Sequence, residues 1–178
     1  DVYAFPMNMS VSAILVNNGV LKEAGIDLNH DNYPKCWQDL MDLFQKCVDA
    51  GIEKPIGLAG QDSSAVTAWT FQYIYQTIYG ENPNWYADIL RGKAAWNDDL
   101  YMEMFNKYSE MLPFIADDAL GTASDGMRKK FITGESPIYF QVAGEVGILK
   151  ELDPDLDILL LPSAFTDKPE DQTIISGF

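Results

Sequence analysis

The sequence predicts an α/β fold, a helix-rich lobe with a small mixed sheet. Short apolar runs of strand length alternate with longer segments whose apolar residues recur at helical spacing. The chain has 178 residues, of which 47% are hydrophobic and 12% aromatic, and this size and composition are typical of one globular domain. No internal repeat, low-complexity tract or Gly/Ser linker divides the chain, so we expect residues 1–178 to form a single lobe.

The first third of the chain contains a predicted strand and two predicted helices. Ala13–Val16 is an apolar run of strand length, and a short helix follows it. We expect that helix to end at Gly25, because glycine readily adopts the left-handed conformation that terminates helices. The second helix is predicted to end at Gly51 and to be amphipathic. Its apolar residues are Trp37, Leu40, Met41, Phe44, Cys47 and Val48.

The middle of the chain is predicted to be mainly helical after a short strand at Ile56–Leu58. The segment from Ala65 to Tyr79 is apolar on nearly every side, which favours a central, buried helix. Asp98 is a suitable N-cap for the next helix, because its carboxylate can accept a free backbone N–H. The apolar face of that helix is predicted to comprise Tyr101, Met104, Phe105, Tyr108 and Leu112.

The last third of the chain is predicted to contain one more helix between short strands. The helix spans residues 125–133 and is expected to end at Gly134. The predicted strands are Pro137–Gln141 and Asp157–Leu161, both rich in apolar residues.

The charge of the chain excludes some classes of partner. Twelve basic and 27 acidic residues give a formal net charge of −15, with the acids scattered along the sequence. A nucleic-acid surface needs clustered Lys and Arg, so we expect no nucleic-acid partner.

The longest apolar run, Ile158–Leu161, is far shorter than the roughly 20 residues of a transmembrane helix. The chain starts at Asp1 without Met and stops at Phe178, so we expect it to be cut from a longer protein.

The two cysteines are predicted to be unpaired. Cys36 and Cys47 bracket one predicted helix, and 11 residues of helix separate them by about 16 Å. A disulfide requires Cα atoms within about 7 Å. Cys47 follows the apolar periodicity of the helix, so we expect it in the core.

No metal or cofactor site is predicted. His30 is the single histidine, and the cysteines lack metal-ligand spacing. Asp27-x-Asn29-x-Asp31 resembles the start of a calcium-binding loop. However, Asn32 replaces the required glycine and Gln38 the bidentate glutamate. We therefore expect a polar turn there.

No catalytic residue is predicted either. Glycosidases place two carboxyl groups roughly 5–9 Å apart across a cleft. The adjacent acids Asp98-Asp99 and Asp117-Asp118 lie at predicted helix starts or in loops, where we expect them to cap helices or face solvent. The sequence has no Gly-x-Ser-x-Gly nucleophile motif and no phosphate-binding loop.

Two turns carry the residue types typical of sugar sites, which combine aromatic faces with carboxylate, amide and hydroxyl groups. The turn from Gly60 to Ser64 precedes a predicted helix that carries Trp69. Its acid and serines either bind sugar hydroxyls or cap that helix, and the two roles are compatible. The segment Gln141–Glu145 places an amide and an acid where a strand passes into a helix.

Several short motifs, taken in order, resemble the extracellular carbohydrate-binding proteins of ABC importers, the maltose-binding-protein-like family. The resemblance is collinear and covers essentially the whole chain. The motifs are Tyr3-Ala4-Phe5-Pro6, Leu21-Lys22-Glu23-Ala24-Gly25-Ile26, Pro34-Lys35-Cys36-Trp37-Gln38-Asp39-Leu40, Ala50-Gly51-Ile52 with Pro55-Ile56, Phe131-Ile132-Thr133-Gly134-Glu135-Ser136-Pro137-Ile138, and Leu159-Leu160-Leu161-Pro162.

The resemblance implies a periplasmic-binding-protein-like fold of two α/β lobes that close over solute about a hinge. This chain would be the second lobe, with the other lobe absent. The implied function is to bind a carbohydrate and deliver it to the permease subunits of an ABC transporter, without catalysis. The implied location is extracytoplasmic, either periplasmic or as a cell-surface lipoprotein. Contact with the membrane would come only through a lipid anchor outside this chain.

The resemblance also places ligand contacts, by motif position, at the four segments that follow the hinge or the strands. These contacts are Asn8, Ser10, Asp62, Ser63, Ser64, Trp69, Gln141, Gly144 and Glu145. The family carries a sugar-stacking Trp where this chain has Gly144 to Val146. Stacking is therefore expected from Trp69, from another aromatic residue or from the absent lobe.

The sequence is also compatible with other functions. One is a receptor for a non-sugar solute such as a polyol, peptide or sugar phosphate; others are a glycan-acting enzyme and a glycan-binding surface module. A phosphate ligand would require a cation in the cleft. We expect both Arg91 and Arg128 to lie away from the predicted turns.

Overall fold

The structure of the chain is a computed structural model that describes residues 10–62, 77–169 and 175–177. Five described strands form one sheet: β1 (Ser10–Asn17), β2 (Ile56–Gly57), β3 (Ile138–Val142), β4 (Ile158–Leu161) and β5 (Ile175–Gly177). The strand order is β2-β3-β1-β4, and β5 also pairs with β1. Strand β1 is antiparallel to β3, β4 and β5, whereas β2 is parallel to β3. The predicted small mixed sheet is thus confirmed.

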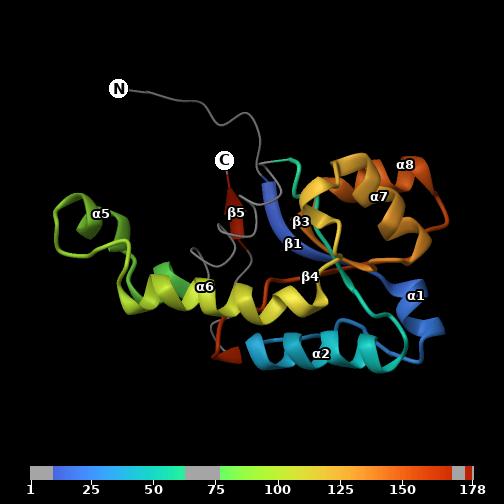
Figure 1. The fold of residues 1–178 in the computed structure, drawn as a ribbon, viewed down its shortest axis with the longest axis horizontal. Helices are drawn as coiled ribbons and strands as arrows, with labels where there is room; N and C mark the ends of the chain where they lie inside the picture. Colours follow the sequence, from blue (N-terminus) through green and yellow to red (C-terminus); the bar gives the residue numbers. More distant parts are fainter. Residues whose placement is uncertain (1–9, 63–76, 170–174, 178) are drawn as a thin grey trace.

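Helices cover both faces of this sheet (Figure 1). They are α1 (Asn18–Glu23), α2 (Trp37–Asp49), α4 (Tyr79–Glu81), α5 (Trp85–Leu90), α6 (Asp99–Met111), α7 (Ser124–Thr133) and α8 (Glu145–Leu152), with short 3₁₀ turns at Leu112–Phe114 and Ala119–Gly121. No helix in the described ranges is both long and apolar enough to cross a membrane.

Adjacent residues of β3 show how the two layers are built. Side chains alternate between the faces of a strand. Phe140 packs against Phe44 of α2, with ring centroids 6.4 Å apart. Tyr139 packs against Phe131 of α7 at the same centroid separation, 6.4 Å. All four rings are fully buried, so β3 runs through the centre of the core, with α2 on one face and α7 on the other.

The ends of three helices confirm the expectations from glycine. Gly25, Gly51 and Gly134 all have positive φ, at 77°, 92° and 79°. A left-handed residue after a helix lets the last carbonyls bond locally, and only glycine adopts it without steric cost. Cys47 is fully buried in α2, as predicted, and this burial raises the pKa of its thiol to about 12.

The prediction for α6 is correct at its start and partly wrong along its face. Asp98 caps the helix by accepting the Tyr101 N–H at 2.8 Å. However, Phe105 and Leu112 are 47% and 62% exposed, while Met104, Met111 and Lys107 are buried. The buried face of α6 therefore includes Lys107. The prediction missed this residue because it counted only apolar side chains as buried.

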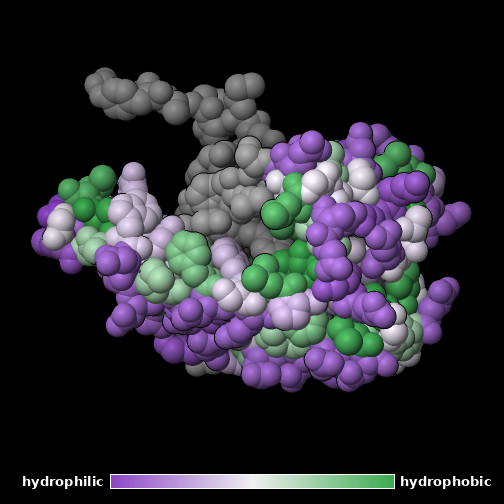
Figure 2. All heavy atoms as spheres, in the orientation of Figure 1, coloured by the Kyte–Doolittle hydropathy of each residue, from purple (hydrophilic) through white to green (hydrophobic). Residues whose placement is uncertain are grey.

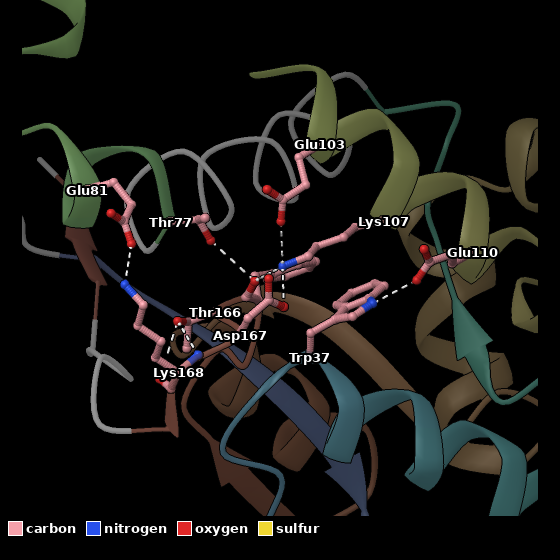
Figure 3. A network of polar contacts seen from close by, with 10 residues as sticks. Trp37, Thr77, Glu81, Glu103, Lys107, Glu110, Thr166, Asp167 and Lys168 are labelled. Atoms are coloured by element: carbon pink, nitrogen blue, oxygen red, sulfur yellow. Dashed lines mark hydrogen bonds and ion pairs between the residues drawn. The ribbon is translucent and has the colours of Figure 1, made fainter. Parts of the chain in front are cut away.

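Lys107 is buried because its ammonium group is fully engaged (Figure 3). Its Nζ donates to the Phe165 carbonyl oxygen at 2.9 Å and to Asp167 Oδ1 at 2.8 Å. It also pairs with Glu103 at 3.1 Å and lies 5.5 Å from the ring centre of Trp37. These contacts join α6, the start of α2 and the segment after β4.

The predicted helix from Ala65 to Tyr79 lies almost wholly outside the described residues. Only its end is described, where Ile78 is fully buried.

Helix α5 was not predicted, and it projects from the far end of α6 (Figure 1). Hydrophobic side chains gather on this projection (Figure 2). Its buried Trp85 stacks on Tyr101 with ring centroids 5.5 Å apart.

Candidate functional site

The sheet brings the predicted ligand-binding segments to one edge. Strand β1 begins at this edge and runs antiparallel to β3 and β4, so its start lies beside their carboxyl ends. Ser10 opens β1, Gln141 is near the end of β3, and Glu145 opens α8. Asp62 follows β2, which is parallel to β3 and ends at the same edge. Ligands of open α/β sheets commonly bind outside the carboxyl ends of the strands.

Four of the predicted contacts lie outside the described residues: Asn8, Ser63, Ser64 and Trp69. Ser10 is described only as the first residue of β1. The geometry of the site therefore rests on Asp62, Gln141, Gly144 and Glu145 and on their partners.

Asp62 is held against the start of helix α7. One of its carboxylate oxygens, Oδ2, accepts the Ser124 backbone N–H at 2.8 Å and the Ser124 hydroxyl at 2.5 Å. Ser124 is the first residue of α7, and the residue before it provides no side-chain cap. The sequence suggested that Asp62 binds hydroxyls or caps the helix that follows it. In the described part of the chain, it caps a helix 62 residues further along.

A close backbone contact fixes the position of Asp62. Gly60 donates its N–H to the Ala119 carbonyl oxygen at 2.9 Å. A Cβ at Gly60 would lie 2.7 Å from this oxygen and 2.9 Å from the Leu120 Cα. Both are backbone atoms that cannot rotate away, so this approach requires glycine.

Glu145 is bound by Arg128 across the gap between α8 and α7. Arg128 Nε donates to Glu145 Oε1 at 2.6 Å, and Nη2 donates to Oε2 at 3.2 Å. The third guanidinium nitrogen, Nη1, donates to Asp125 Oδ1 at 2.6 Å. The side chain of Glu145 is 6% exposed and that of Arg128 is 19% exposed.

The expectation that Arg128 lies away from the predicted turns is therefore wrong. Arg128 is 17 residues from Glu145 in the sequence, and strand β3 lies between the two helices that carry them. The strand returns the chain along the sheet, so the start of α8 meets the middle of α7. A pattern search along one helix cannot detect such a pair.

Gln141 and Tyr139 form the sheet side of the site. Gln141 donates from Nε2 to the Tyr139 hydroxyl at 3.1 Å and accepts the Val142 N–H at 2.9 Å through Oε1. Tyr139 is fully buried, whereas Gln141 is partly exposed. The two residues are on the same face of β3, since they are two apart. Gln141 is thus the more exposed member of the pair, and its hydrogen bond to the buried Tyr139 holds it in position.

Electrostatic coupling connects these groups into one cluster, which we call the edge cluster: Asp62, Ser124, Asp125, Arg128, Tyr139, Gln141 and Glu145. Burial raises the pKa of Tyr139; the Gln141 hydrogen bond opposes this, Glu145 and Asp62 add to it, and Arg128 lowers it. The pKa of Asp62 lies below its usual value, first because of the Ser124 hydroxyl, with a smaller effect of Arg128. The hydrogen bond to Glu145 is the main cause that raises the pKa of Arg128.

The turn before α8 has room for a larger side chain. Gly144 directly precedes α8, and a Cβ at this position would meet no atom of the described residues within 4 Å. The family feature expected near this turn is a stacking Trp, and Gly144, Glu145 and Val146 stand there instead. In the described residues, this turn offers polar groups and open space where the resemblance implies an aromatic face.

The chemistry of the edge cluster favours binding over catalysis. A general acid or base needs a carboxyl group within reach of the substrate proton. Asp62 already accepts two hydrogen bonds from Ser124, and both oxygens of Glu145 accept from Arg128. The groups that remain for a ligand are the partly exposed amide of Gln141 and the neighbouring oxygens.

No described group of three or more His, Cys, Asp and Glu side chains is placed to hold a metal ion. The calcium-like segment forms a polar turn closed by its own asparagines, as predicted. Asn32 Oδ1 accepts the Asn29 N–H at 2.7 Å, and Asn32 Nδ2 donates to the Asp27 carbonyl oxygen at 2.8 Å.

Sequence reasoning missed four members of the edge cluster, namely Ser124, Asp125, Arg128 and Tyr139. Ser124 could have been suspected as a cap residue at the start of a predicted helix. Tyr139 carried no separate signal, because its strand reads as a continuous apolar run.

Comparison with known proteins identifies relatives of this chain. The family described as bacterial extracellular solute-binding protein matches residues 1–178. The sn-glycerol-3-phosphate-binding periplasmic protein UgpB of Rhizobium meliloti (strain 1021) is 26% identical over 161 residues, which cover 89% of this chain and 36% of UgpB.

Solved structures show the same fold. A chitin oligosaccharide binding protein superposes with a TM-score of 0.79 at 20% identity, covering 99% of this chain and 43% of its own. A sugar transporter of Bacillus licheniformis in complex with stachyose superposes with a TM-score of 0.76 at 21% identity, covering 99% of this chain and 46% of its own. The chain therefore spans less than half the length of these relatives.

Proposed function

Since the chain belongs to the family of bacterial extracellular solute-binding proteins, we propose that the whole protein is the solute-binding component of an ABC importer for a sugar or oligosaccharide. The family binds solutes and is not a family of enzymes. Residues 1–178 are proposed to be its second lobe, with the solute held between this lobe and one outside the chain. The proposed partners are the permease subunits, and the proposed location is outside the cytoplasmic membrane, with or without a lipid anchor.

The observation that carries the proposal is the edge cluster itself. Carboxylate, amide and hydroxyl groups gather at the carboxyl ends of β2 and β3, and Gln141 is positioned by Tyr139 from the core. Sugars offer many hydroxyls that such groups can bind. Relatives with the same fold include a chitin oligosaccharide binding protein and a transporter protein in complex with stachyose, which supports a carbohydrate ligand.

The site as proposed has a rigid part and an open part. Asp62 and Glu145 are held by Ser124 and Arg128, so they shape the site without large rearrangement. The open turn at Gly144 leaves the stacking of a sugar ring to Trp69, to another aromatic residue or to the other lobe. The proposed direct contacts are Asn8, Ser10, Asp62, Ser63, Ser64, Trp69, Gln141, Gly144 and Glu145.

A receptor for a non-sugar solute is the second candidate. The similarity to a glycerol-3-phosphate-binding protein favours it. A phosphate ligand would need a cation such as Arg128, and binding it there would require Arg128 to be released from Glu145. The two candidates differ in the charge of the ligand, and a binding screen separates them.

The test is a thermal-shift screen of the full-length protein. The panel contains galactose, maltose, chitobiose, raffinose and stachyose, with glycerol and sn-glycerol 3-phosphate for the second candidate. Ligand at about 100 times its Kd adds about 2.7 kcal/mol and raises the midpoint by several degrees. We expect a shift with one family of sugars. A shift with sn-glycerol 3-phosphate alone would contradict the sugar receptor and favour the second candidate.

A pair of variants locates the site. Gln141→Ala removes the proposed contact and is expected to weaken binding of the best sugar at least tenfold. Gln45→Ala is the matched control, because Gln45 is an exposed glutamine on α2 whose amide donates to Asp49 on the same helix. Equal affinity of both variants for the sugar would place the binding site elsewhere.

A further inference from the structure

We propose that the edge cluster discriminates against negatively charged solutes, and that Glu145 sets this preference by occupying the guanidinium group of Arg128. The inference rests on the proposed function for the location of the site. It adds a ligand class, uncharged as opposed to acidic or phosphorylated solutes. It also adds a specificity-determining residue.

Each of the three guanidinium nitrogens of Arg128 already donates to a carboxylate of the protein. Nε and Nη2 both donate to Glu145, and Nη1 donates to Asp125. An anionic ligand would normally be bound by a guanidinium through two parallel N–H donors. Here the carboxylate of Glu145 already has that two-donor arrangement, and its side chain is only 6% exposed. The Glu145 carboxylate thus occupies the position on Arg128 that the anionic group of a ligand would take.

The second step is the balance of charge in the edge cluster. Asp62, Asp125 and Glu145 carry three negative charges against the single positive charge of Arg128. Asp62 and Glu145 both act on the Tyr139 hydroxyl, so their fields overlap at the sheet side of the site. A phosphate or carboxylate brought to Gln141 would meet this net negative field. An uncharged sugar would meet only hydrogen-bonding groups.

The third step is that Glu145 is held in place and would not easily give way to a competing anion. It opens α8 directly after the turn at Gly144, and a carboxylate in the first turn is favoured by the helix dipole. Its chain position is fixed by β3, whose register with β1 runs through Val142. An anion would have to displace a carboxylate that the fold supplies at high effective concentration.

The wild-type measurement compares matched solutes by calorimetry on the full-length protein. The pairs are galactose with galacturonate, glucose with glucose 6-phosphate, and glycerol with sn-glycerol 3-phosphate. In any pair that binds, we expect the neutral member to bind at least 10-fold more tightly, a difference of about 1.4 kcal/mol. An acidic member that binds as tightly as its neutral partner would overturn the inference.

The decisive variant is Glu145→Gln, which keeps the shape of the side chain and removes its charge. We expect this variant to gain at least 10-fold in affinity for sn-glycerol 3-phosphate. Adding Arg128→Gln to it should abolish the gain, because the anion would then lose its cation. A gain that survives in the double variant would show that Arg128 is not the group that binds the anion and would contradict the inference.

Matched controls separate a local effect from a change in overall charge. Glu151→Gln removes an exposed carboxylate from the same helix, and Lys129→Gln removes an exposed cation next to Arg128. Neither should change sn-glycerol 3-phosphate affinity by more than about twofold, since exposed charges are screened by salt. If Glu145→Gln fails to fold, Asp125→Asn frees Nη1 from a residue whose side chain is 94% exposed and should give a smaller gain in the same direction.

The two proposals fail in different ways. If no sugar binds the wild-type protein but Glu145→Gln gains anion binding, the sugar receptor is wrong and the role of Glu145 stands. If a sugar binds through Gln141 but neither Glu145→Gln nor Asp125→Asn gains anion affinity, the role of Glu145 is wrong and the receptor stands.

Discussion

Lys107 and Arg128 both form ion pairs, but they differ in their burial and in the groups that surround them. Lys107 is 5% exposed and lies between α6, Trp37 of α2 and the segment after β4 (Figure 3). Its Nζ donates to a main-chain carbonyl, that of Phe165, at 2.9 Å. Arg128 is 19% exposed and binds the side chains of Glu145 and Asp125 at the edge of the sheet.

The difference shows that burial and pairing do not by themselves mark a functional cation. Lys107 satisfies a backbone carbonyl and fixes one segment against two helices, which is a structural task. Arg128 neutralises a carboxylate beside the hydroxyl of Tyr139 and also acts on Asp62. Of the two, it is Arg128 that lies beside groups at the ends of β2 and β3, and this position is what links it to the proposed binding site.

The largest loss of stability is expected when Arg128 is removed from the edge cluster. Arg128→Met leaves the Glu145 carboxylate almost fully buried without a partner, and unfolding free energy should fall by about 3 kcal/mol. Glu145→Gln should cost clearly less, because Arg128 is more exposed and keeps Asp125. Urea unfolding of the full-length protein at pH 7 measures both, with Lys129→Met as the control that stays within about 0.5 kcal/mol. Equal losses for the two edge variants would contradict this asymmetry.

A somewhat smaller loss is expected at the structural cation. Lys107→Met keeps the stem packed but removes the shorter of two hydrogen bonds to the Phe165 carbonyl, which also accepts from Thr77 at 3.2 Å, so the free energy of unfolding should fall by about 2 kcal/mol. Solute affinity of the folded protein should stay within about twofold. The exposed Lys46→Met on α2 is the matched control. Loss of solute affinity in Lys107→Met, with stability unchanged, would reverse the roles assigned to the two cations.

The smallest change in stability is expected from substitution of Asp62, and this change depends on pH. The hydrogen bonds from Ser124 hold the pKa of Asp62 below its usual value. A lowered pKa in the folded state stabilises the protein above the unfolded-state pKa of about 3.9, and this contribution disappears as pH falls through the lower, folded-state pKa. The stability gap between wild type and Asp62→Ala should therefore be constant from pH 7 to 5 and shrink on further acidification. Urea unfolding at several pH values measures it, and a gap that widens in acid would refute the assigned contact.

Local chemistry explains which parts of the fold could be predicted from the sequence. The helix ends at Gly25, Gly51 and Gly134 follow from the backbone freedom of a single residue type. The cap at Asp98 and the burial of Cys47 follow from nearest-neighbour spacing. Strand positions followed from short apolar runs, although β1 extends from Ser10 to Asn17, well beyond the predicted Ala13–Val16.

The parts that could not be predicted depend on contacts between distant elements. The burial of Lys107 depends on a carbonyl 58 residues away. The cap that Asp62 provides lies on a helix 62 residues away. The candidate site was predicted as a set of segments, which the sheet brings to one edge, but the pairing of Glu145 with Arg128 required the fold.

The most direct test of the account is a crystal structure of the full-length protein with the sugar that gives the largest thermal shift. We predict the sugar at the carboxyl ends of β2 and β3, with a hydroxyl within hydrogen-bonding distance of the Gln141 amide and with the Arg128–Glu145 pair intact. A sugar bound away from this edge, or one that displaces Glu145 from Arg128, would contradict the account.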